Sequence, residues 1–112
     1  MESKRQNKIS RLIQKELAEI FLLESRHLFE GAMITVTKVN VTKDLSVARI
    51  YVSLYAVKDK NDLLTRIRLL TKELRKQLGL RIRNQMRFMP ELEFFMDDSL
   101  DYIENIEKLL KH

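Results

Sequence analysis

The chain has 112 residues, of which 45% are hydrophobic, with a formal charge of +5 and a sequence pI of about 9.6. This length suits one compact domain over residues 1–112 and leaves no room for a second core. There are no cysteines, which excludes disulfides and thiolate metal sites. No segment approaches 18 consecutive apolar residues, so we expect a cytoplasmic protein with no membrane partner.

The charge is sorted along the chain. Residues 61–90 hold eight basic and two acidic side chains, whereas residues 91–112 hold two basic and seven acidic ones. A basic middle section favours a polyanion such as RNA or DNA as the partner. The alternative is a solvated helix face that carries lysines and arginines for solubility alone.

The first predicted element is a helix over residues 3–23. Its apolar residues recur at the three-four spacing of a buried stripe, as Ile9, Leu12, Ile13, Leu17, Ile20 and Phe21. The opposite face carries a basic ridge made of Lys4, Lys8, Arg11 and Lys15. This ridge is as typical of a solvated face as of a binding face. A connection containing Leu28, Phe29 and Gly31 then ends near Ala32.

Two β-branched runs follow, at residues 34–42 and 48–54, and they predict paired strands. The segment between them contains Asp44 and Ser46, whose side chains can bond to nearby backbone in a turn. We therefore expect an antiparallel hairpin, with Asp44 as a turn residue rather than a metal ligand.

Residues 61–88 have a helical pattern, but one straight helix of that length, roughly 40 Å, is too long for so small a domain. The break falls either near Gly79 or around residues 70–72. At about 100° per residue, one helix face collects Arg68, Lys72, Arg75, Lys76, Gly79 and Arg83. A glycine within this basic stripe costs helix stability but lets another backbone, such as a phosphodiester chain, approach closely.

The end of the chain predicts a third strand and a short helix. Pro90 stops the helical region, and residues 92–96 alternate as a strand does, in an edge or a central position. Residues 99–111 predict an acidic amphipathic helix, which would pack on this chain or on another protein. The order is helix, strand, strand, helix, helix, strand and a terminal helix, which is an α+β fold with three strands and helices on one face.

Catalytic and cofactor chemistry is not indicated. The two histidines, His27 and His112, are not spaced as a metal site or a catalytic dyad, and two glycines cannot build a phosphate loop. We therefore expect no enzyme activity, no cofactor, no metal and no small-molecule substrate. Most aromatic residues occupy positions expected to face the core, so no stacking platform for single-stranded nucleic acid is evident.

Four blocks of the sequence resemble the ribosome-binding factor A family. They are residues 13–17 (IQKEL), residues 41–53 (VTKDLSVARIYVS), the pair Leu74-Arg75, and residues 87–94 (RFMPELEF) followed by Asp97. Their order and separations are fairly specific when taken together, and the match spans nearly the whole chain.

The resemblance implies a type II KH-like domain with the order α-β-β-α-α-β, in which the segment between the second and third helices faces the RNA. It implies a noncatalytic factor that binds free 30S subunits and 16S rRNA, assists late 30S maturation and 16S rRNA processing, and supports growth in the cold. We expect a monomer, although the sequence leaves the oligomeric state open. The family commonly has an alanine-any-glycine kink between these two helices. Here Leu70-Thr71-Lys72 stands in its place, which leaves open whether Gly79 supplies the bend.

These observations give two hypotheses. In the first, the basic second and third helices bind RNA phosphates, assisted by the N-terminal ridge, and reversing Arg75 and Lys76 to glutamate abolishes binding without harming the fold. In the second, the chain is a protein-interaction adaptor that uses the acidic helix at residues 99–111. Deleting residues 99–112 distinguishes the two.

Overall fold

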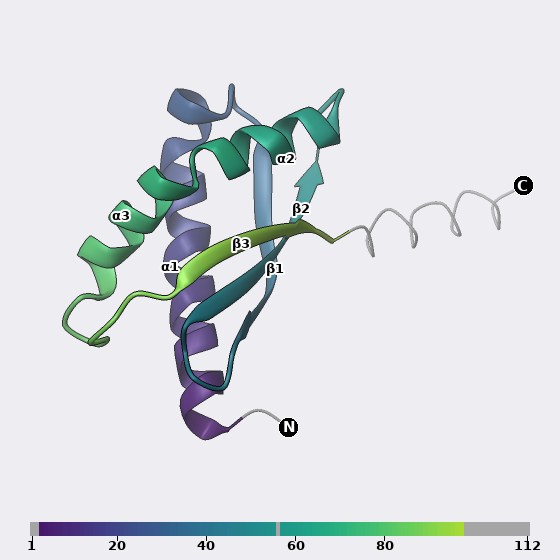
Figure 1. The fold of residues 1–112 in the computed structure, drawn as a ribbon. Helices are drawn as coiled ribbons and strands as arrows, with labels where there is room; N and C mark the ends of the chain where they lie inside the picture. The colour runs from purple at the N-terminus through teal and green to yellow at the C-terminus, as the bar shows by residue number, and fades with distance from the viewer. Residues whose placement is uncertain (1–2, 56, 98–112) are drawn as a thin grey trace, which may run out of the picture.

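The computed structural model describes residues 3–55 and 57–97 (Figure 1). Its elements in chain order are α1 (Lys4–Leu28), β1 (Met33–Val41), β2 (Val47–Tyr55), α2 (Lys60–Leu69), α3 (Thr71–Ile82) and β3 (Glu91–Met96). The α+β class and the order α-β-β-α-α-β are therefore confirmed. The acidic helix predicted at residues 99–111 lies outside the described residues. Within the described ranges, no helix combines the length and apolarity needed to cross a bilayer.

Helix α1 begins with a capping box, in which Ser3 and Gln6 each bond the other's backbone N–H. It continues five residues beyond its predicted end. The reason is packing: buried Phe29 follows the helix directly and its ring lies 5.6 Å from that of Phe21. The chain then turns through Gly31, whose φ of 81° is one that glycine adopts without strain.

The sheet has the strand order β1-β2-β3, and β3 forms one edge. β1 and β2 pair antiparallel, as predicted, whereas β2 and β3 pair parallel because the two helices between them carry the chain back. The carboxylate of Asp44 accepts hydrogen bonds from Thr42 Oγ1, Ser46 N and Ser46 Oγ. Asp44 is thus a turn residue, as its sequence context indicated.

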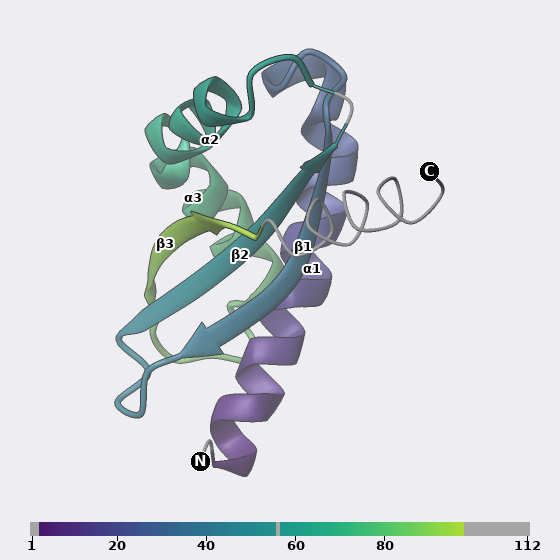
Figure 2. The same cartoon turned by 90° about the vertical axis from the view of Figure 1, so that its right-hand side faces the viewer.

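The core lies between the sheet and the helices, which cover one face of it (Figure 2). Alternate residues of β2 point into this core, namely Ala48, Ile50, Val52 and Leu54. They meet the apolar stripe of α1, where Ile13 and Leu17 have no exposed surface. The predicted arrangement of three strands with helices on one face is therefore present.

The helical region breaks at Leu70, one of the two positions expected from the sequence, and not at Gly79. Leu70 has φ −97° and ψ 10°, and its N–H bonds to the carbonyls of both Arg66 and Ile67. Gly79 lies inside α3. The break needs no glycine, because the φ of Leu70 is negative and non-glycine residues can adopt it. It lets two separate apolar stripes enter the same core, namely Leu63, Leu64 and Ile67 from α2, and Leu74, Leu78 and Ile82 from α3.

Candidate nucleic-acid interface

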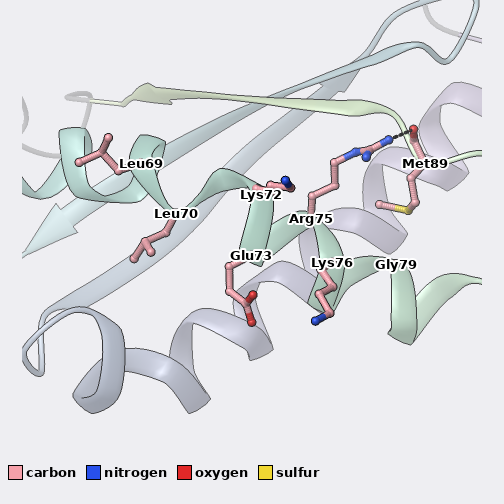
Figure 3. Close-up of a pocket in the computed structure, with 8 residues that line it drawn as sticks. All are labelled: Leu69, Leu70, Lys72, Glu73, Arg75, Lys76, Gly79 and Met89. Atoms are coloured by element: carbon pink, nitrogen blue, oxygen red, sulfur yellow. Dashed lines mark hydrogen bonds between the residues drawn. The ribbon is translucent and has the colours of Figure 1, made fainter.

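An open hollow of about 670 Å³ lies beside the α2–α3 break (Figure 3). We call it the α2–α3 hollow, and its lining residues are Leu69, Leu70, Lys72, Glu73, Arg75, Lys76, Gly79 and Met89. Four of the ten residues predicted as RNA contacts line it together, since the first turns of α3 carry Lys72, Arg75 and Lys76 and the next turn carries Gly79. Three cations and one carboxylate make this hollow net positive.

Gly79 faces Met89 across the hollow. A Cβ atom built on Gly79 would lie 3.5 Å from Met89 Cγ, which is an ordinary van der Waals contact. Packing within the described protein therefore does not require a glycine here. No contact within the described protein accounts for a glycine in the middle of this helix, where it costs helix stability.

Arg68 and Arg75 have contacts that the sequence did not reveal. Arg68 donates from Nε and Nη2 to the carbonyl of Phe94, at 3.1 and 2.7 Å. Arg75 donates from Nε to Pro90 at 3.0 Å and from Nη2 to Met89 at 2.8 Å. Arg68 thus ties α2 to the edge strand β3, and Arg75 ties α3 to the segment directly before that strand. Each uses two of its five N–H donors in doing so.

Lys72, Lys76 and Arg83 differ from these two arginines. All three are exposed, and they have no hydrogen-bond or ion-pair partner in the part of the chain that the structure describes. Lys72 and Lys76 line the α2–α3 hollow, whereas Arg83 follows the end of α3. These cations are free to meet an anion from outside.

The predicted basic ridge on α1 is also exposed. Lys4, Lys8, Arg11 and Lys15 are all on the solvent side of the helix, and none of them lines the α2–α3 hollow. The structure therefore does not bring all ten predicted residues to one place. It separates the ridge on α1 from the cations on α3.

Ion pairs fix α1 against α3. Arg81 Nη1 lies 2.9 Å from Glu16 Oε2 and 3.3 Å from Glu19 Oε2. The hydrogen bond to Glu16 is the main cause that raises the pKa of the Arg81 guanidinium, so this group stays charged. Because Gln6 also donates to the carbonyl of Val41, α1 is held on its sheet side as well. The two basic surfaces are therefore in fixed relative positions.

Sequence reasoning missed a second hollow, at the N-terminal half of α1. Lys8 lines it together with Arg5, Arg87 and Phe88, none of which was proposed as a site residue. Phe88 is 78% exposed, unlike the core-facing positions expected for most of the aromatic residues. The helical pattern over residues 61–88 hid these two residues, because in the structure α3 ends at Ile82 and Arg87 and Phe88 belong to the connection before Pro90. No group of three potential metal ligands occurs among residues 3–55 and 57–97.

Comparison with known proteins assigns the family. The sequence profile described as "Ribosome-binding factor A" matches residues 5–110. A protein of that name from Cytophaga hutchinsonii is 51% identical over 110 residues, which cover 98% of this chain and 83% of the relative.

Solved structures agree with that match. The crystal structure of ribosome-binding factor A from Thermus thermophilus has a TM-score of 0.66 at 29% identity, covering 81% of this chain and 94% of that one. A homology model of the Thermus thermophilus factor, fitted into an electron cryomicroscopy map of a 30S complex, has a TM-score of 0.62 at 30% identity, covering 80% and 91%. The chain studied here belongs to the ribosome-binding factor A family.

Proposed function

We propose that this protein is a noncatalytic ribosome assembly factor that binds the small ribosomal subunit through its RNA. The α2–α3 hollow is the observation that carries the proposal, because it combines unpaired lysines with a glycine that the fold does not require. Family membership supports it, and so does the relative that was fitted into a 30S complex. Exposed cations of this kind bind phosphates with little base selectivity.

The finer form of the proposal follows the family. The protein acts as a monomer in the cytoplasm, with residues 1–112 as one KH-like domain of type II. It binds 16S rRNA of free 30S subunits, and it assists late maturation, 16S rRNA processing and growth in the cold.

Each predicted site residue has a role in this proposal. Lys72, Lys76 and Arg83 contact phosphates, and Gly79 lets the RNA backbone approach α3. Arg68 and Arg75 hold β3 in place and keep further N–H donors for a phosphate. The ridge of Lys4, Lys8, Arg11 and Lys15 adds a second phosphate-binding surface on α1.

Cosedimentation tests this function. Purified protein is mixed with free small subunits, large subunits and assembled ribosomes at several salt concentrations. We expect selective binding to free small subunits, and we expect the Lys72→Glu/Lys76→Glu variant to lose it. Lys58→Glu makes the same kind of charge change at an exposed site outside the α2–α3 hollow and serves as the control. Equal, salt-labile binding to all three particles would contradict the proposal.

A further inference from the structure

The second hollow has a volume of about 660 Å³ and is built from three segments of the chain. We call it the α1–turn hollow. The N-terminal half of α1, the β1–β2 turn and the α3–β3 connection meet here, at the end of the molecule near the N-terminus (Figure 1). Its lining residues are Arg5, Lys8, Ile9, Leu12, Asp44, Leu45, Gln85, Met86, Arg87 and Phe88. This volume lies within the range of about 300 to 1,000 Å³ that is typical of small-ligand sites.

Its surface is apolar and preformed. Ile9, Leu12, Leu45 and Met86 are partly buried and pack against the core, so the floor of the hollow is anchored. The first turn of α1 is fixed by its capping box and by the Gln6 hydrogen bond to Val41. Above this floor the ring of Phe88 is 78% exposed. An exposed aromatic ring over an apolar floor is the feature that a flat, uncharged ligand group fits.

The rim of the hollow is basic. Arg5, Lys8 and Arg87 are exposed and have no partner among residues 3–55 and 57–97. The only carboxylate among the lining residues belongs to Asp44, and its Oδ1 already accepts three hydrogen bonds within the turn. Three free cations around an apolar centre complement a ligand that has an aromatic group and a negative charge.

The hollow shares one chain segment with the proposed RNA surface. Met89 lines the α2–α3 hollow, while Met86, Arg87 and Phe88, just before it in the chain, line the α1–turn hollow. The α3–β3 connection therefore contributes to both sites.

We propose that the α1–turn hollow binds one unpaired nucleotide of the bound RNA, with its base stacked on Phe88 and its phosphates on Arg87, Lys8 and Arg5. This rests on the proposed function, since RNA is the partner, and it adds a contact to a base. Every nucleobase has a flat face that stacks on an aromatic ring, whereas an acidic peptide would use the cations and leave Phe88 without a matching group.

Fluorescence of a single tryptophan tests the proposal. The chain contains no tryptophan, so Phe88→Trp introduces the only one, at a position where the ring can still stack. We expect a single-stranded RNA oligonucleotide to quench its emission. An oligomer of the same length and charge whose sugars carry no bases should not do so, and neither should polyglutamate. Leu22→Trp is the matched control, because Leu22 is 77% exposed and lies outside the hollow.

Affinity measurements complete the test. Phe88→Ala should weaken binding of the oligonucleotide by about tenfold, which is within the range for loss of one stacked base. Phe88→Leu keeps an apolar side chain without the flat ring and should weaken binding nearly as much. Equal quenching by the base-free oligomer or polyglutamate, equal quenching at the Leu22 position, or unchanged affinity of Phe88→Ala would overturn the proposal.

The two proposals fail in different ways. If wild-type protein and Phe88→Ala bind free small subunits and the oligonucleotide equally well, the nucleotide site is wrong and the assembly-factor function stands. If oligonucleotides quench Phe88→Trp but the protein does not prefer small subunits, the nucleotide site stands and the proposed function is wrong.

Discussion

Arg75 donates from its Nε to the carbonyl of Pro90, whereas Lys76, the next residue, has no partner in the described part of the chain. The two side chains belong to one basic stripe in the sequence, but their contacts differ. The planar guanidinium reaches two neighbouring carbonyls at once, which a lysine ammonium cannot do with the same geometry. Within one basic stripe, Arg75 therefore stabilises the fold, whereas Lys76 is available to a ligand.

Single charge reversals should separate these two roles. Lys76→Glu should weaken binding to small subunits and leave the free energy of unfolding nearly unchanged, because its side chain is exposed and unpaired. Arg75→Glu should lower the free energy of unfolding by about 1 to 3 kcal/mol, since it removes charged hydrogen bonds to the carbonyls of Met89 and Pro90, directly before β3. Urea unfolding and cosedimentation measure the two effects.

This result would revise the expectation that reversing both residues leaves the fold intact. The Lys58→Glu variant again controls for net charge. If Arg75→Glu unfolds at the same urea concentration as the wild type, the hydrogen bonds to Met89 and Pro90 contribute nothing measurable.

The two glycines should respond to alanine in opposite directions. Gly79→Ala should raise the free energy of unfolding by about 0.5 to 1 kcal/mol, because the position is helical and its new Cβ makes only ordinary contact with Met89. Gly31→Ala should lower the free energy of unfolding despite open space, because its φ is 81°. Thermal unfolding measures both changes.

Binding gives the second readout for Gly79. If the RNA backbone approaches α3 at this point, the stabilised Gly79→Ala variant binds small subunits more weakly than the wild type. Unchanged affinity would remove Gly79 from the proposed interface.

At the scale of elements, the helices and strands were predictable but some boundaries and contacts were not. The hairpin followed from β-branched runs on either side of Asp44, whereas α3 ends at Ile82, six residues before the predicted end of the helical region at residue 88. The five extra residues of α1 depend on Phe29 packing against Phe21, a contact made in three dimensions. The sequence left two positions open for the break, near Gly79 and around residues 70–72. The break at Leu70 depends on how α2 and α3 pack into the core, which the sequence pattern does not show.

The contribution of the β1–β2 turn to the free energy of unfolding should depend on pH. Hydrogen bonds from the Ser46 and Thr42 side chains lower the pKa of the Asp44 carboxyl, so its ionised form is favoured in the folded state. This stabilisation is present above about pH 4 and is lost as the pH falls through the lowered pKa.

Asp44→Asn removes the ionised group at every pH. The free energy of unfolding should therefore differ between wild type and Asp44→Asn at pH 7, and the difference should shrink below about pH 4. Urea unfolding at several pH values measures it. A difference that is constant from pH 7 to pH 3 would mean that the charge of Asp44 has no part in the turn.

For the whole molecule, the important feature is the rigid pairing of α1 with α3 through Arg81 and Glu16. It fixes the distance between the basic ridge on α1 and the lysines of the α2–α3 hollow. The sequence predicted both surfaces but could not relate them, because residue spacing describes one helix at a time. It also could not show which carbonyls Arg68 and Arg75 bond, since those carbonyls lie 14 to 26 residues away in the chain.

The salt dependence of small-subunit binding should report the number of phosphate contacts. Each cation that neutralises a phosphate contributes roughly 0.7 to 0.9 to the slope of log affinity against log salt concentration. Lys72→Gln/Lys76→Gln should therefore reduce this slope for small-subunit binding by about 1.5. Lys58→Gln should leave the slope unchanged. An unaltered slope in the double variant would place both lysines outside the interface.

The parallel pairing of β2 with β3 has a consequence for how the chain folds. The hairpin of β1 and β2 joins neighbouring segments, whereas β3 joins β2 only after both intervening helices have crossed the sheet. Because closing long loops is slow, we expect β3 to dock late. Arg68 and Arg75 gain their carbonyl partners in the same step, so the α2–α3 hollow reaches its final shape only when the last strand is in place.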